Sequence, residues 1–269
     1  MKKNILLGLI SILVIGLLAA CGTKDNEPES GQGAEGENSE KKTLTVGTSA
    51  DYAPFEYIDT AKSDEIIGFD IDIINSIADK LGYNLKITDT SFDGLIIALE
   101  ANKFDFVISG MTPTPKRKEN VDFTDVYYVA NHMIVSKKDS GINTIEDLKG
   151  KTVGVQLGSI QEEEANSIAE TVDITIESRS RIPELLQEIQ IGRFDAAIIE
   201  DTVAQGYLNK MEDLSGFTIE GDEEEVGYAI AFPKGSGLTE EFNNALNEMK
   251  ENGELDKLII KWFGEEEEK

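Results

Sequence analysis

The residues best suited to chemistry in this chain lie between Ser109 and Arg117, directly after the apolar run 104–108. This run predicts a buried strand, and a strand that ends in Ser-Gly presents backbone N–H groups where open α/β sheets bind ligands. Arg117 can fold back over the same end of the strand and hold a carboxylate through two parallel hydrogen bonds. With the N–H group of Gly110 and the N–H and hydroxyl groups of Thr112, it would form an anion receptor. A polar loop with a solvated arginine is the alternative.

Two prolines, Pro113 and Pro115, interrupt this segment. Proline lacks an N–H group and restricts the backbone of the residue before it, so we expect no helix directly after the strand. The chain should instead reach Arg117 as a stiffened loop.

A second anion site is predicted further along the chain. Ser159-Ile160-Gln161-Glu162 fits a capping box, so a helix should begin here. The free N–H groups of Ile160 and Gln161 at its start could bind an anion. Ser159 would cap the helix in either case.

A weak internal repeat relates the strand before Ser109 to a second strand, which ends at Glu200. Four residues recur at an offset of 90 positions: Leu95, Leu99, Phe104 and Asp105 match Leu185, Ile189, Phe194 and Asp195. In each copy a helix is followed by Phe-Asp and a buried strand, and the strands end in Ser109-Gly110 and Glu200-Asp201 respectively. Two similar lobes, each with polar groups at a strand end, predict one cleft between them. Phe-Asp before an apolar run is common, so a chance match is the alternative.

The elements that position these residues follow an α/β pattern from Thr43 onward. The helix that opens at 68–73 carries Asp70 and Asp72 at its positive end, and Gly82 ends it. The other expected strands cover 44–47, 85–88, 133–136, 151–155 and 227–232, with a polar and aromatic loop at 48–55 and further helices at 92–99, 240–251 and 255–263.

Composition bounds the class of protein. A chain of 269 residues can form two domains, and its formal net charge of −27 argues against a nucleic-acid partner, which needs concentrated lysine and arginine. One cysteine and one histidine exclude a disulfide framework, a Cys/His zinc site and the usual Ser–His–Asp triad. We therefore predict no catalytic residue, no metal and no cofactor, and we interpret His132 as structural.

The first forty residues have a different character. Residues 1–20 form an export signal, with Lys2 and Lys3 before an apolar stretch too short to span a membrane. The stretch ends in Leu-Ala-Ala-Cys, which resembles a bacterial lipobox and implies that Cys21 becomes the lipid-bearing (palmitoylated) mature N-terminus. A simple signal peptide with a chance cysteine is the alternative. Residues 21–42 are polar and predict a disordered tether.

Several spaced segments together resemble the solute-binding proteins of bacterial ABC transporters, in the group that binds polar amino acids. They are Gly68–Ile73 with Ile77-Ala78 and Leu81-Gly82, Tyr52–Phe55, Ser109–Arg117, Val121–Thr124, Gly154–Gly158 and Lys261–Gly264. The resemblance implies an α/β periplasmic-binding-protein fold of two lobes, each a mixed sheet flanked by helices, hinged by two chain crossings. We place lobe one at 43–130 plus 227–269, lobe two at 133–223, and the crossings near 130–133 and 224–227.

The resemblance also implies a ligand site. Arg117 would bind the α-carboxylate of an L-amino acid, helped by the N–H groups of Thr112 and Ile160. The Gly110 carbonyl, the Thr112 hydroxyl and Glu200 would take the α-ammonium, with Asp201 as the alternative acid. The remaining positions are Tyr52 and Phe92, which would sandwich the ligand side chain unless they only pack in the core, and Ser109 in the same loop.

Side-chain specificity stays open on this reasoning. Family members that prefer basic ligands often carry an acid directly after Gly-Thr, where this chain has Ser49. Asp51 or Glu56 could substitute and Gln161 could contribute, so glutamine, arginine or a similar amino acid is expected. The predicted function is a lipid-anchored receptor on the extracytoplasmic face of the cell membrane that passes its ligand to an ABC permease. A dehydratase-like enzyme on the same scaffold and an amino-acid sensor are the alternatives.

Overall fold

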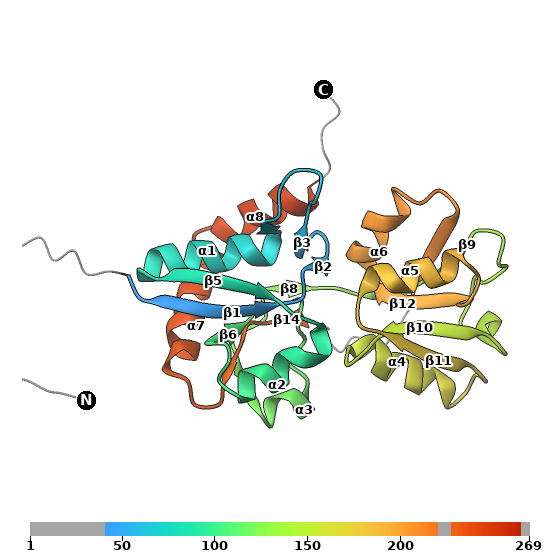
Figure 1. Cartoon of the computed structure of the whole chain (residues 1–269), viewed down its shortest axis with the longest axis horizontal. Helices are drawn as coiled ribbons and strands as arrows, with labels where there is room; N and C mark the ends of the chain where they lie inside the picture. The colour runs from blue at the N-terminus through green and yellow to red at the C-terminus, as the bar shows by residue number, and fades with distance from the viewer. Residues whose placement is uncertain (1–40, 220–226, 265–269) are drawn as a thin grey trace, which may run out of the picture. The chain divides into compact units, whose positions relative to one another are not determined.

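The computed structural model describes residues 41–219 and 227–264, which lie in one compact unit that runs from Glu40 onward. The predicted export signal at 1–20, the lipidation site Cys21 and nearly all of the tether lie outside the described residues. In the described ranges the chain is mixed α/β and contains two five-stranded sheets, which define two lobes (Figure 1).

The first lobe is built on a sheet of strand order β5-β1-β6-β15-β7. β1 pairs in parallel with β5 and β6, whereas β15 runs antiparallel to β6 and β7. The strands span Thr43–Thr48 (β1), Asn84–Asp89 (β5), Phe106–Val107 (β6), Val121–Phe123 (β7) and Ala231–Pro233 (β15). The helices of this lobe are α1 (Phe69–Leu81), α2 (Leu95–Glu100) after the short 3-10 helix Phe92–Gly94, α3 (Pro115–Lys118), α7 (Gly237–Glu251) and α8 (Glu254–Phe263).

The second lobe repeats this arrangement with the strand order β11-β10-β12-β9-β13. β10 pairs in parallel with β11 and β12, and β9 runs antiparallel to β12 and β13. Its strands span His132–Lys137 (β9), Thr152–Gln156 (β10), Thr175–Arg179 (β11), Ala196–Glu200 (β12) and Leu214–Thr218 (β13). The helices are α4 (Ile160–Ala169), α5 (Ile182–Gln190) and α6 (Asp201–Leu208), with a 3-10 turn at Glu146–Leu148.

The internal repeat has a structural counterpart in the two copies of Phe-Asp. The Asp105 carboxylate accepts a hydrogen bond of 2.7 Å from the Thr45 N–H, and the Asp195 carboxylate accepts one of 2.9 Å from the Thr152 N–H. Each aspartate therefore ties its buried strand to the start of the neighbouring parallel strand. Each phenylalanine ring also lies against a glycine of that neighbouring strand, so closely that an added Cβ would overlap the ring. The same local packing thus recurs in both lobes.

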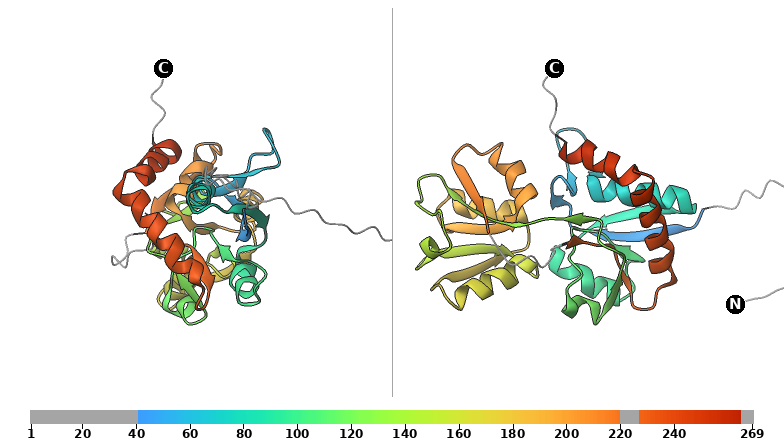
Figure 2. Two further views of the ribbon diagram at one scale, coloured as in Figure 1. Left: turned by 90° about the vertical axis from the view of Figure 1, so that its left-hand side faces the viewer. Right: turned by 180° about the vertical axis from the view of Figure 1, so that it is seen from behind.

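Two chain segments that connect the lobes pair with each other. β8 (Tyr128–Val129) and β14 (Gly227–Tyr228) form an antiparallel two-stranded sheet beside the first lobe. Figure 2 shows the first segment running from one lobe to the other. The strand expected over 227–232 is therefore wrong as a single element, because it divides into β14 at the crossing and β15 in the main sheet. The second crossing lies largely outside the described residues.

Two other local expectations were wrong. The loop expected at 48–55 contains β2 (Asp51–Tyr52), which pairs with β3 (Glu56–Ile58), and β3 pairs with β4 (Ile66–Ile67). The four-residue helix α3 begins at Pro115, only a few residues after β6. Proline is favourable at the first position of a helix, because the N–H it lacks has no partner within the helix there.

Helix α1 ends as predicted, with Gly82 in the left-handed conformation at φ 78°. Its two first-turn acids, however, do more than interact with the helix dipole. Asp72 accepts hydrogen bonds from the Trp262 indole at 2.6 Å and from Lys261 at 2.7 Å, and it thereby fastens α8 to α1. No helix among the described residues is both long and apolar enough to cross a membrane.

Candidate functional site

A small cavity, partly open to solvent, lies between the ends of the parallel strands of both lobes. It brings together ten of the predicted site residues: Ser49, Tyr52, Glu56, Phe92, Ser109, Gly110, Thr112, Arg117, Ile160 and Gln161. Three further residues complete the lining: Gln156, Ser159 and Tyr228. Two predicted residues, Asp51 and Glu200, do not line it, and Cys21 lies outside the described part of the chain.

Arg117 is held in the cavity by backbone carbonyl groups. The Thr114 side chain caps α3 by accepting from the Arg117 N–H, which orients the arginine at the start of that short helix. The guanidinium donates to the carbonyl of Thr112 at 2.7 Å and across the lobes to that of Gly158 at 3.0 Å, and it lies 5.3 Å from the centroid of the Phe92 ring.

The charge of Arg117 has no acidic partner among the described residues. Burial lowers the pKa of the guanidinium to about 10, and the charge of Glu163 acts in the opposite direction. A buried cation without a counter-ion is costly, because desolvation is not offset by a nearby opposite charge. The arrangement therefore favours an anionic group in the cavity beside Arg117.

The N–H group of Gly110 is not part of this anion receptor, contrary to the sequence-based expectation. It donates at 2.9 Å to the carboxylate of Asp70, which is fully buried. Gly110 itself has a left-handed φ of 48° and lies under the Tyr52 ring, where a Cβ would approach a ring carbon to 3.0 Å. Glycine thus permits both the turn after β6 and the close approach of the aromatic ring.

A second buried acid supports the same loop. The hydroxyl of Ser109 donates to Glu56 at 2.7 Å and accepts from the Ser49 N–H at 3.0 Å. Burial, and then the charge of Asp70, raise the pKa of Glu56 well above its usual range, while burial raises the pKa of Asp70 to about 6. Both pKa values are therefore raised, and the two acids hold the loop through the hydrogen bonds that they accept from Ser109 and Gly110.

The second lobe contributes the start of helix α4. The Ser159 hydroxyl accepts from the Glu162 N–H at 3.2 Å and donates to the Gln156 carbonyl at 2.7 Å. Glu162 returns a bond by accepting from Gly158 at 2.9 Å. Ser159 thus caps the helix as predicted, but the capping box is incomplete, because Glu162 accepts from Gly158 and the Ser159 N–H donates to the Gln156 carbonyl. Ile160 and the largely buried Gln161 line the cavity.

Glu200 lies next to the cavity without lining it. Its side chain caps α6 by accepting from the Val203 N–H at 2.6 Å, and burial raises its pKa to about 8. After burial, the charge of Glu200 makes the largest contribution to the raised pKa of Tyr52, and it also acts on Tyr228. The carboxyl group therefore lies close to the wall that these two tyrosines form.

The alternative acid, Asp201, has other partners. It accepts at 2.9 Å from the Asn131 amide and at 2.8 Å from the Thr202 N–H. It therefore fastens α6 to the crossing segment. His132, at the start of β9, lies opposite Glu200 in the antiparallel register. No cluster of three or more potential metal ligands occurs within residues 41–219 and 227–264.

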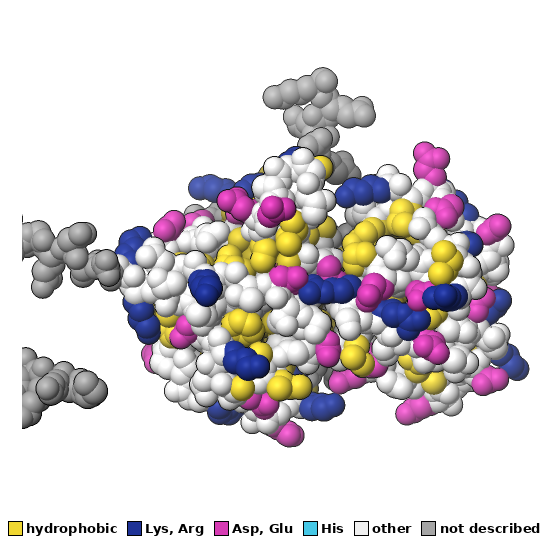
Figure 3. Space-filling model, viewed as in Figure 1, with side chains coloured by type: hydrophobic (Ala, Val, Ile, Leu, Met, Phe, Trp, Pro, Cys, Tyr) yellow, Lys and Arg dark blue, Asp and Glu magenta, His cyan; other side chains and the backbone are white. Residues whose placement is uncertain are grey.

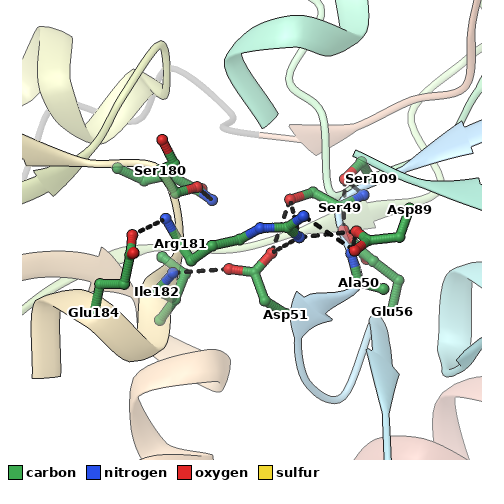
Figure 4. A network of polar contacts seen from close by, with 11 residues as sticks. Ser49, Ala50, Asp51, Glu56, Asp89, Ser109, Ser180, Arg181, Ile182 and Glu184 are labelled. Carbon is green, nitrogen blue, oxygen red and sulfur yellow. Dashed lines mark hydrogen bonds and ion pairs between the residues drawn. The ribbon is translucent and has the colours of Figure 1, made fainter. Parts of the chain in front are cut away.

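Asp51 belongs to a contact between the lobes. One of its carboxylate oxygens is 3.2 Å from Arg181, and the other accepts from the Ile182 N–H at 2.7 Å. Figure 4 shows both contacts. The Ser49 hydroxyl, although it lines the cavity, also donates to Asp51 at 2.7 Å. The expectation that Asp51 faces a ligand side chain is therefore not met, because its oxygens are occupied.

The sequence and the fold have counterparts among known proteins. Residues 44–265 match the family described as bacterial extracellular solute-binding proteins, family 3. The chain belongs to this family.

Individual relatives of this solute-binding protein agree with that assignment. It is 53% identical to the arginine-binding extracellular protein ArtP of Bacillus subtilis (strain 168), over 98% of each chain. Two structures of an ancestral arginine-binding protein, one bound to arginine and one to glutamine, are each 41% identical, with a TM-score of 0.77. They cover 84% of this chain, which covers 100% and 99% of theirs. These relatives are binding proteins.

Three residues that line the cavity of this solute-binding protein were not predicted as site residues from the sequence. Tyr228 lies on β14 beside the crossing, and its hydroxyl is 3.2 Å from that of Tyr52. Its position near the start of the chain segment that returns to the first lobe is the one feature of the sequence that could have suggested Tyr228 as a lining residue. Gln156 ends β10, the strand equivalent to β1, so the repeat could have indicated it. Ser159 was recognised as a cap, and its place in the lining follows from that position.

Proposed function

We propose that this protein captures a polar or basic L-amino acid in the cavity between its lobes and delivers it to an ABC permease. The observation that carries the proposal is Arg117, a half-buried arginine whose guanidinium lies in the cavity with carbonyl partners and no acidic partner among the described residues. An α-carboxylate supplies the missing charge in a planar, bidentate form that matches the guanidinium.

Two buried oxygens are suited to the α-ammonium. In the described ranges, the Thr112 hydroxyl and one carboxyl oxygen of Glu200 are buried without a hydrogen-bond partner. Buried polar atoms are nearly always paired, so unpaired ones beside a cavity favour a ligand that donates to them. An ammonium group can donate three hydrogen bonds. In this proposal Glu200 acts beside Tyr52 and Tyr228, and the carbonyl of Gly110 is the third acceptor.

The ligand side chain is proposed to lie between the rings of Tyr52 and Phe92. Beyond them Ser49, Glu56 and Gln161 present polar groups to the cavity. Glu56 is the one predicted acid that remains at the lining after Asp51 is excluded, and one of its oxygens has no partner in the part of the chain that the structure describes. Both a guanidinium and an amide can donate to it. This fits the arginine and glutamine found in the ancestral relative.

The test is calorimetric titration after a thermal-shift screen of the twenty L-amino acids, since a ligand that binds the native state raises the melting temperature. Arg117→Ala should weaken binding of the best ligand by about 100- to 1,000-fold, because two hydrogen bonds to a charged group are lost. The matched control is Arg193→Ala, which removes an exposed arginine of the second lobe that pairs with Glu188. Unchanged affinity of the Arg117 variant would refute the site.

The same proposal includes a lipid anchor and excludes catalysis. We propose a signal peptide at 1–20, a lipid on Cys21 and a tether at 21–42, with lobes at 43–130 plus 227–269 and at 133–223. Replacement of Cys21 by serine should move the protein from the membrane fraction to the medium, whereas unchanged fractionation would contradict the anchor. Prolonged incubation with the ligand should return it chemically unaltered, and any product would indicate an enzyme.

A further inference from the structure

A group of charged residues beside the cavity joins the two lobes directly. Arg181 precedes α5 in the second lobe and extends toward the first lobe (Figure 4). Its guanidinium donates to both carboxylate oxygens of Asp89, at 2.8 and 3.0 Å. It also lies 3.2 Å from Asp51 and 3.3 Å from the Ser49 hydroxyl. Every one of these acceptors belongs to the first lobe, at the ends of β1 and β5 and in β2.

The two acids are positioned before Arg181 reaches them. Asp89 accepts from the Ala50 N–H at 2.8 Å, and Asp51 accepts from the Ser49 hydroxyl at 2.7 Å. Both carboxylates therefore point the same way from one lobe. The two carboxylates repel each other and lose part of their hydration at this position. A cation from the opposite lobe therefore stabilises them more here than it would at an open surface. Figure 3 shows acidic and basic side chains gathered where the lobes meet.

The contact is well enclosed at Asp51, whereas the side chain of Asp89 is 36% exposed. The side chain of Asp51 is only 9% exposed and that of Arg181 is 28% exposed. The Ile182 N–H adds a backbone bond of 2.7 Å to Asp51, at the start of α5, where the helix dipole also favours a carboxylate. The bidentate geometry at Asp89 is the strongest form of such a pair.

We propose that Arg181 is a closing residue: by binding Asp51 and Asp89 it stabilises the closed arrangement of the lobes whether or not a ligand is present. The proposal rests on the proposed function in one respect, namely that closure of the lobes holds the ligand. Arg117 also donates across the lobes, to Gly158, but it would contact the ligand, whereas Arg181 would not. Since apparent affinity scales with the fraction of molecules in the competent state, a closing residue raises affinity from outside the site.

The variant Arg181→Met keeps an apolar stem and removes the charge. In the full-length protein we expect the dissociation constant for the best amino acid to rise about tenfold, which is the effect of losing one well-placed charged pair. Asp89→Asn removes the same contact from the opposite lobe. If the two residues act as a pair, the double variant should be little worse than either single variant, as a double-mutant cycle measures.

Small-angle X-ray scattering of the ligand-free variants tests closure independently of the ligand. The radius of gyration of Arg181→Met should exceed that of the wild type, and far-UV circular dichroism should show that the variant is folded. The control is Arg193→Met, which removes another arginine of the second lobe. It should change neither the radius of gyration nor the dissociation constant. If no amino acid binds the wild type, the proposed function fails. The radius of gyration then decides by itself whether Arg181 stabilises the closed arrangement.

Two results would overturn the proposal. One is a dissociation constant of Arg181→Met within twofold of the wild type together with an unchanged radius of gyration. The other is additive effects of Arg181→Met and Asp89→Asn, which would mean that the two residues do not act on each other.

Discussion

Asp70 offers a sharp test of how the buried acids support the binding loop. Its carboxyl group is fully buried, accepts from the Gly110 N–H, and has a pKa raised from 3.8 to about 6 by burial. The folded protein therefore binds this proton more tightly than the unfolded chain. The carboxyl contributes its full stability below about pH 4 and loses it as the pH rises through about 6. At 1.36 kcal/mol per pKa unit, the loss is about 3 kcal/mol.

The perturbation is Asp70→Asn, which keeps an oxygen for the Gly110 N–H and removes the titrating proton. Unfolding by urea should be followed by circular dichroism and by fluorescence of Trp262, at several pH values from 4 to 7. The stability of the wild type relative to the variant should fall by about 3 kcal/mol over this range. Carboxylates away from Asp70 cancel in the comparison because both proteins share them, whereas the change at Glu56, whose pKa the charge of Asp70 raises, is part of the measured effect.

The matched control is Asp79→Asn, which removes an exposed acid from the same helix. Its stability relative to the wild type should change little with pH. Parallel curves for the wild type and Asp70→Asn would show that the carboxyl does not take up a proton on folding, and the account of the buried pair with Glu56 would then be wrong.

Three further predictions concern the site, the repeat and the helix contacts. At pH 7 Glu200 is mostly protonated, because burial raises its pKa to about 8, so binding an ammonium there should release a proton. The binding enthalpy measured by calorimetry should then depend on the buffer that takes up the proton. Equal enthalpies in phosphate and Tris would contradict the role of Glu200. Gly154→Ala should destabilise the protein by about 1–3 kcal/mol, because the new Cβ overlaps the Phe194 ring. Gly237→Ala should not destabilise it, because nothing lies close to the new Cβ there. The urea midpoints of both variants measure this, and equal midpoints for the two would refute the packing argument. Trp262→Phe should cost about 1–3 kcal/mol by leaving Asp72 without its indole donor, and a melting temperature equal to that of the wild type would show that this bond does not matter.

Local patterns predicted most helices and strands, for reasons that the structure makes plain. Helix α1 follows from its apolar spacing and from Gly82, and α4 from the cap at Ser159. The matching Phe-Asp pairs predicted two similar lobes, because each pair solves the same local problem of packing a ring on a neighbouring glycine. The misplaced elements were short ones, such as β2 and β14, whose hydrogen bonds go to partners distant in sequence.

The candidate site was predicted in part. Arg117 could be recognised because a guanidinium after a strand end has few structural uses, and the aromatic pair followed from the family resemblance. The use of the Gly110 N–H by Asp70, by contrast, joins residues forty positions apart. No spacing rule connects such residues, so the sequence could not show that this donor was already occupied.

The sequence by itself determined the order of the elements, the repetition of one lobe plan and the presence of a cation at a strand end, because these depend on residue type and local spacing. The tertiary structure decided which polar groups remain free. Asp51 and Asp89 are bound by Arg181 from the opposite lobe, and Glu200 caps α6 without lining the cavity. Each donor hydrogen and each acceptor lone pair has one main partner, and that partner is decided by which distant segment approaches it.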